Sequence, residues 1–223
     1  MKSFIVDSAA FVLLAFPALF SIINPLGGAF IFLSATQGVS RKARRALARK
    51  VAIFSFATLV ASMVIGVFVL RFFGISMPVL GVAGGIVIAL SAWKMLNAEQ
   101  DNTGRESALQ ASADRDLENM AFYPLTMPIT TGPGTISVAV ALGTRGVAEG
   151  NPLLFAFQVL LTAVPMSLLI YALYASSGRL ARAVGPTGTT IIARLSAFLL
   201  FCIGIQVMWG GIEALVRGLA TAT

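Results

Sequence analysis

The residues NPLGG, Asn24–Gly28, interrupt an apolar stretch that runs from about Ala9 to Ser34. A second apolar stretch is interrupted in the same way by TTGPGT, Thr130–Thr135. Proline removes a backbone donor and clashes with the preceding turn, and glycine weakens a helix, so each stretch is predicted to break at these residues. The fold is therefore expected to be organised around two broken helices.

Six apolar stretches are long enough to cross a membrane, because about 20 apolar residues span roughly 30 Å of hydrocarbon as a helix. They are predicted at about residues 9–34, 51–70, 77–93, 121–142, 153–176 and 195–212. A polar cytoplasmic loop, about 94–120, divides a single membrane domain of residues 1–223 into repeat A, about 4–96, and repeat B, about 121–217. The predicted fold class is an all-α membrane protein with six transmembrane helices, of which the first and fourth are broken.

Composition supports a membrane protein and argues against most enzymes. The 223 residues are 57% hydrophobic and only 11% charged, whereas a soluble domain carries roughly a quarter charged residues. The chain has no histidine and one cysteine, which removes most metal sites, Ser-His and Cys-His catalysis and any intrachain disulfide. We therefore expect a protein that is not an enzyme and has no resident metal.

The net charge of +7 is explained by orientation. Six cations and no anion lie between Arg41 and Lys50, and most of the other cations lie in the polar loop or in the connection after the fifth stretch. The positive-inside rule places these connections in the cytoplasm and both termini outside. Clustered Lys and Arg also attract phosphate, so a lipid-headgroup or nucleic-acid patch is an alternative for this basic run. We predict the lipid bilayer, and no nucleic acid, as a partner.

A shift of 107 residues superposes the two interruptions without a gap, placing Asn24 on Thr131 and Gly27 on Gly134. Three predicted spans separate the copies, and an odd number turns the second half upside down relative to the first. The sequence thus predicts two inverted three-helix repeats, a plan typical of secondary transporters in which broken helices meet at the membrane midplane.

Each break is expected to free amides and carbonyls for a ligand. Amides at Gly27, Gly28, Gly134 or Thr135 would face a carboxylate, and carbonyls near Asn24 and Thr131 would face an ammonium group or a sodium ion. The alternative is that Pro and Gly here only permit kinks or close helix packing. The predicted substrate-binding residues are Asn24, Pro25, Gly27, Gly28, Thr130, Thr131, Gly132, Gly134 and Thr135.

No Asp, Glu, Lys or Arg lies inside the six spans as predicted. Ionisable residues in the membrane are the usual proton relays, so coupling to sodium, or no coupling, is more compatible than proton coupling. A sodium ion is the one cofactor that the sequence suggests. The stripe Gly81, Gly84 and Gly85 in the third span is interpreted first as a close helix-packing surface.

These motifs resemble the MarC family of bacterial inner-membrane proteins. The resemblance rests on Asn24–Gly27 with the following Phe30–Ser34, on Tyr123–Pro128, and on Gly132–Ser137, and it covers nearly the whole chain. It implies a multi-pass protein of the inner membrane, similar to the LysE-type exporter group, in which some relatives are described as small neutral amino-acid transporters. It does not imply drug efflux.

The leading hypothesis is a secondary transporter, an exporter or a sodium-linked carrier, of a small neutral metabolite such as an amino acid. Alternating access between the two inverted halves would move the substrate. The alternative is a non-transporting membrane protein with an assembly or regulatory role. The sequence leaves substrate, direction, coupling ion and oligomeric state open.

Overall fold

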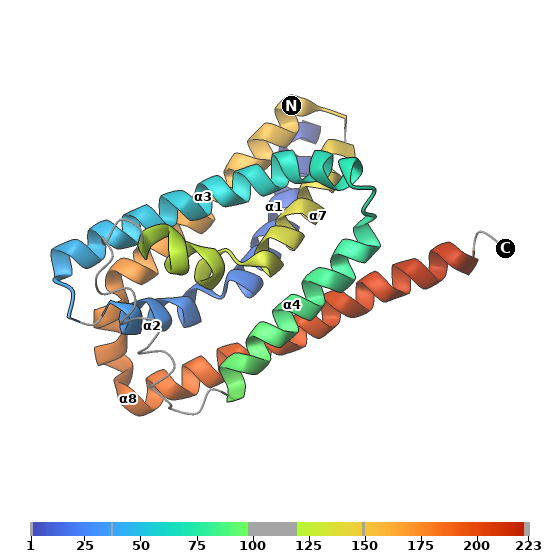
Figure 1. Cartoon of the computed structure of the whole chain (residues 1–223). Coiled ribbons are helices and arrows are strands. Elements are labelled where there is room, and N and C mark those ends of the chain that lie inside the picture. The colour runs from blue at the N-terminus through green and yellow to red at the C-terminus, as the bar shows by residue number, and fades with distance from the viewer. Residues whose placement is uncertain (1, 37, 98–119, 149, 221–223) are drawn as a thin grey trace.

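The computed structural model describes residues 2–36, 38–97, 120–148 and 150–220, which are helical and contain no strand. Most of the predicted polar loop lies outside these residues. The elements are α1 (Lys2–Ile23), α2 (Pro25–Ala35), α3 (Arg41–Phe72), α4 (Met77–Asn97), η1 (Ala121–Thr130), α7 (Pro133–Ala148) and α8 (Pro152–Ala220). Figure 1 shows them as a bundle of long helices that surrounds the shorter α2 and η1.

Five of the described helical segments are long and apolar enough to cross a membrane: Val6–Ala35, Arg41–Phe72, Met77–Asn97, Pro152–Gly185 and Thr187–Gly218. The fourth predicted span, residues 121–142, is not among these segments, so six spanning helices are not confirmed among the described residues. Residues 121–142 form η1 and the start of α7, and η1 has 10 residues and α7 has 16. The break at Thr131 and Gly132 divides this stretch into two pieces, and neither piece is long enough alone.

The predicted break in the first span is present, but it is confined to one residue. Asn24 has left-handed backbone angles (φ 45°, ψ 61°) between α1 and α2. Pro25 is then the first residue of α2, where a missing amide costs nothing because that amide has no helical partner. The Asn24 side chain caps α2 by accepting a bond from the Gly27 amide (3.2 Å). Helix restarts at once, so Gly27 and Gly28 are helical rather than unwound.

A sharp corner at Gly185 joins the last two spans, where the sequence suggested a longer basic connection. Gly185 has φ 74° and ψ 173°, a conformation that is essentially restricted to glycine. Helix continues on both sides of it, so the predicted connection 177–194 is two helix ends meeting at one residue. In Figure 1 the two arms of α8 diverge from this corner, the second running beside α4.

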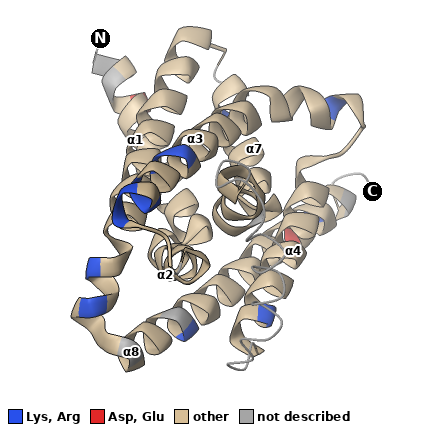
Figure 2. Ribbon diagram, turned by 60° about the vertical axis from the view of Figure 1, so that its left-hand side comes forward, with Lys and Arg blue, Asp and Glu red and all other residues tan. Residues whose placement is uncertain are grey.

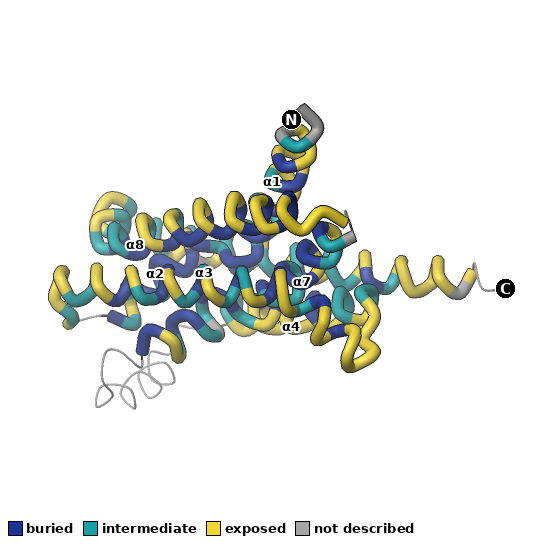
Figure 3. Tube along the Cα trace, turned by 90° about the horizontal axis from the view of Figure 1, so that it is seen from above, coloured by how far each residue is buried: buried dark blue, intermediate teal, exposed yellow. Residues whose placement is uncertain are grey.

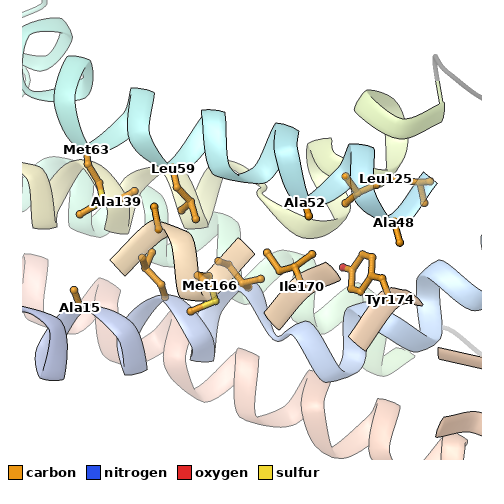
Figure 4. Packing of buried hydrophobic residues seen from close by; sticks show 14 of the residues in the cluster. Ala15, Ala48, Ala52, Leu59, Met63, Leu125, Ala139, Met166, Ile170 and Tyr174 are labelled. Atoms are coloured by element: carbon orange, nitrogen blue, oxygen red, sulfur yellow. The ribbon is translucent and has the colours of Figure 1, made fainter. Parts of the chain in front are cut away.

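The first arm of α8 forms the centre of the bundle. Its residues Met166, Ile170 and Tyr174 are fully buried, and Figure 4 shows them lying between α3, which contributes Leu59 and Met63, and the first helix. Exposed residues lie along the outer faces of the long helices and over most of the second arm (Figure 3). Many of these are large and apolar, among them Leu13, Phe68 and Leu199. Such faces suit lipid rather than water.

Glycines bring α4 and the second arm of α8 into backbone contact. A methyl group at Gly204 would lie 2.5 Å from the Ala89 amide nitrogen, and one at Gly211 would lie 2.6 Å from the Pro78 carbonyl oxygen. On α4, Gly85 faces the same helix, whereas Gly84 faces Ser137 of α7. The packing interpretation of the Gly81, Gly84 and Gly85 stripe is thus confirmed, since small residues let helices approach closely in lipid.

Candidate functional site

The second break leaves backbone groups without partners. The Thr131 amide donates to the Thr126 carbonyl oxygen (2.8 Å) and closes η1, and the Ile136 amide donates to the Gly132 carbonyl oxygen (3.1 Å) and opens α7. The amides of Gly134 and Thr135 have no hydrogen-bond partner among the described residues. Two free N–H groups therefore lie at the N-terminus of α7, where the helix dipole is positive.

A cavity of about 330 Å³ opens at this break, a volume within the range of small-molecule sites. Its walls come from both broken helices, α4, α7 and the second arm of α8. The lining residues are Ile22, Ile31, Val87, Ile88, Ser91, Lys94, Met95, Ile129, Thr130, Gly132, Pro133, Gly134, Thr135 and Leu200. We call it the α7 cavity.

The α7 cavity is lined by four of the nine predicted site residues: Thr130, Gly132, Gly134 and Thr135. Thr131 is fully buried and does not line it. The hydroxyl of Thr130 donates to the Leu125 carbonyl oxygen (2.7 Å), so it is held by η1. The Thr135 hydroxyl has no partner among the described residues, and it can bond to a ligand.

Lys94 is a cavity residue that the sequence analysis missed. It lies in the last turn of α4, is exposed, and makes no hydrogen bond or ion pair within the described part of the chain. Lys94 lines the cavity together with Gly134 and Thr135, whose amides are free, so positive charge and N–H donors both belong to its lining. Read along the sequence, Lys94 was only one more orientation cation at a helix end, and no local pattern indicates that α4 brings it to the second break.

The first break supplies apolar walls but no free amides. Ile22 and Ile31 line the cavity, whereas Asn24, Pro25, Gly27 and Gly28 do not. The Gly27 amide donates to the Asn24 side chain (3.2 Å), and the Gly28 amide donates to the Asn24 carbonyl oxygen (2.9 Å). In this structure Asn24 accepts from both of these amides, so neither is free for a carboxylate.

Tyr174, in the first arm of α8, joins the two breaks. The Thr130 hydroxyl gives its one proton to Leu125, so it accepts the bond from the Tyr174 hydroxyl (2.9 Å). The Tyr174 hydroxyl also lies directly against Gly28, and the Tyr174 ring stacks on the Phe32 ring with centroids 4.8 Å apart. Tyr174 is fully buried. The sequence analysis missed it too, because its role depends on contacts between helices far apart in the chain.

This contact predicts a rescue. Gly28→Ala alone should lower the free energy of unfolding by about 1–3 kcal/mol, since the new methyl group overlaps the Tyr174 hydroxyl. Tyr174→Phe alone should cost about 1 kcal/mol for the lost hydrogen bond. In the double variant the overlap with the hydroxyl is gone and only the tighter-than-usual contact with the ring carbon Cζ, at 3.2 Å, remains, so the total should be smaller than the sum of the single effects. Thermal unfolding of the four proteins in detergent measures this; strictly additive costs would contradict the contact.

These observations define the class. The described residues form helices, and five of these helical segments are long and apolar enough to cross a bilayer. Such a chain is a multi-pass integral membrane protein. The chain belongs to the MarC family: the model of the MarC family integral membrane proteins matches residues 9–216. The family resemblance noted in the sequence is thereby confirmed.

Curated relatives agree over most of their length. The chain is 32% identical over 207 residues to the UPF0056 inner membrane protein MarC of Escherichia coli O1:K1 / APEC, covering 89% of this chain and 92% of the relative. It is 31% identical, with the same coverage, to the proteins of that name from Escherichia coli strain K12 and Shigella flexneri. No solved structure matches. The chain is therefore a multi-pass inner-membrane protein.

Proposed function

We propose that this protein is a secondary transporter, an exporter or a sodium-linked carrier, of a small neutral metabolite such as an amino acid. The observation that carries the proposal is the α7 cavity of about 330 Å³, whose lining includes both Lys94 and the N-terminus of α7 with its two free amides. Donors of this kind suit a carboxylate. Ile129 and Thr130, at the end of η1, also line the cavity, and their carbonyls have no amide partner among the described residues, which suits an ammonium group or a sodium ion.

The positions of the two breaks support an inverted repeat. The 107-residue shift pairs Asn24 with Thr131, and the helix is interrupted at each of these two residues. In this scheme α1 with α2, α3 and α4 form one half, and η1 with α7 and the two arms of α8 form the other. Alternating access would rock these halves around the α7 cavity.

The same glycines also favour the alternative of a non-transporting membrane protein in one respect. A methyl group at Gly134 would overlap Ile88 of α4, and one at Gly27 would lie 2.6 Å from the Asn24 side-chain nitrogen. Substituting either glycine would therefore disturb packing as well as any site. Transport has to be tested with the intact protein and with residues that do not support the fold.

We expect purified protein in liposomes to carry labelled alanine, glycine or serine faster than protein-free liposomes. An inward sodium gradient should accelerate uptake if sodium fills the carbonyl edge of the cavity, and it should leave the rate unchanged if the protein only equilibrates its substrate. The measurement is initial uptake over a panel of amino acids with sodium or with potassium outside. Flux equal to that of empty liposomes across the whole panel would contradict the proposal.

A further inference from the structure

A second cavity lies away from both helix breaks, where α3 begins and the first arm of α8 approaches its corner. Its volume is about 190 Å³. Five of its seven lining residues are arginines, with Ala175 and Gly178 completing the wall: Arg41, Arg44 and Arg45 come from α3, and Arg179 and Arg182 come from α8. Figure 2 shows the positive residues gathered at this end of the two helices. We call it the arginine cavity.

The positive charge of this cavity has no compensating carboxylate in the described part of the chain. Only two acidic residues are described, Asp7 and Glu213, and neither lines the cavity. Glu213 is already paired with Arg217 (2.6 Å). Guanidinium groups are cations, and like charges gathered in one cavity repel one another. An anion in the cavity would relieve this repulsion.

Arg44 is held in place as a binding group. Its Nη2 donates to the Thr36 carbonyl oxygen (2.8 Å) and, more weakly, to the Val39 carbonyl oxygen (3.4 Å). The other terminal nitrogen, Nη1, lies over Gly178, only 3.3 Å from where a methyl group there would sit. Its Nε is buried and has no partner among the described residues. The guanidinium is thus fixed by the fold while one of its donors remains unused.

The start of α3 adds a second source of positive potential. The Ser40 side chain accepts from the Ala43 amide (3.2 Å), and the Ser40 carbonyl accepts from the Arg44 amide (2.9 Å). The amides of Arg41 and Lys42 have no partner within the described residues. The 32-residue helix α3 therefore has the positive end of its dipole and two free amides at its first residues, and the first of these, Arg41, lines the arginine cavity.

We propose that the arginine cavity binds a phosphate group. Several forked guanidinium groups supply more donors than one carboxylate can accept, whereas phosphate offers three or more acceptor oxygens in a geometry that arginine matches. The volume of about 190 Å³ suits a phosphate with few attached atoms. Two sources share this chemistry: the headgroup of an anionic phospholipid, since both helices leave candidate membrane spans here, and a free phosphate or small phosphate ester.

The first experiment is thermal unfolding of the full-length protein in detergent, with inorganic phosphate or with chloride at equal ionic strength. We expect phosphate at about a hundredfold its Kd to raise the unfolding temperature by about 5 °C or more. The double variant Arg45→Gln with Arg179→Gln should lose this shift. Neither side chain makes a hydrogen bond or ion pair among the described residues, so the variant should fold. Arg71→Gln, at the far end of α3, is the matched control and should keep the shift.

The second experiment places the protein in nanodiscs of phosphatidylcholine with or without phosphatidylglycerol. The measurements are the unfolding temperature and the retained lipid, the latter by native mass spectrometry. Stabilisation by phosphatidylglycerol that the double variant loses assigns the site to a lipid headgroup, and stabilisation by inorganic phosphate alone assigns it to a soluble phosphate. No effect of either probe on the wild type overturns the proposal. Equal loss in Arg71→Gln overturns it as well, because it would show general attraction to a basic surface. Neither experiment depends on transport.

Discussion

Replacing Gly85 with alanine should lower the thermal unfolding temperature by about 2–12 °C. The added methyl group would lie 2.6 Å from the Gly204 carbonyl oxygen and 2.7 Å from the Met208 Cα, and it would overlap the Met208 amide nitrogen. These are backbone atoms of α8, which cannot rotate away as a side chain can. Overpacking of this kind costs about 1–3 kcal/mol, and each kcal/mol shifts the midpoint of a chain this size by about 2–4 °C.

Gly81→Ala is the matched control, since Gly81 lies one turn earlier on α4 and faces the same helix. A methyl group there would meet the Gly211 Cα at 3.5 Å, an ordinary contact, so its unfolding temperature should stay within about 2 °C of the wild type. Scanning fluorimetry in detergent measures both variants. An unchanged midpoint for Gly85→Ala would show that α4 and the second arm of α8 do not approach as closely as described.

This contact also explains why helix packing could be predicted from the sequence only in part. The stripe on α4 was visible because small residues recur at helical spacing. Its partner was not, because Gly204 and Gly211 lie more than a hundred residues further along the chain, and pairing two helices needs their relative rotation. In lipid no hydrophobic driving force selects that rotation, so it follows from shape complementarity, which a single sequence does not display.

The two breaks could be predicted because their causes are local. Proline and glycine act on the backbone of their own turn, and both breaks lie within the predicted segments. The consequences of the first break were harder to predict. Asn24 is a favoured N-cap residue and Pro25 a favoured first helical residue, a signal that could have indicated a helix restarting at once with its amides satisfied.

The candidate sites depended on tertiary structure. Thr130, Gly132, Gly134 and Thr135 were predicted from the break alone, but Lys94 and Tyr174 reach it from helices that are distant in sequence. The basic run after Ser40 was interpreted as an orientation signal. Helix continues up to the corner at Gly185, and Arg179 and Arg182 on it line the arginine cavity together with the arginines at the start of α3. Charge counted along a chain cannot show which charges converge.

Lys94→Gln should weaken binding of the transported amino acid about ten- to a hundredfold. The proposal places the substrate carboxylate between the Lys94 ammonium group and the free amides of Gly134 and Thr135. A hydrogen bond to a charged group contributes about 1.5–3 kcal/mol, and each 1.4 kcal/mol is a factor of ten in Kd. Because Lys94 is exposed and makes no hydrogen bond or ion pair among the described residues, folding should be unaffected. The measurement is the KM of uptake into liposomes, with unfolding temperature as the check on folding.

Two comparisons separate this carboxylate contact from a general effect of charge. Lys94→Arg should keep most of the affinity, and Lys42→Gln, which removes an exposed cation that lines neither cavity, should leave KM unchanged. Alaninamide lacks the carboxylate, so it should compete weakly against the wild type and equally weakly against Lys94→Gln. A wild-type KM in Lys94→Gln would remove Lys94 from the site. Loss of alaninamide competition on the same substitution would instead mean that Lys94 shapes the cavity without contacting the carboxylate.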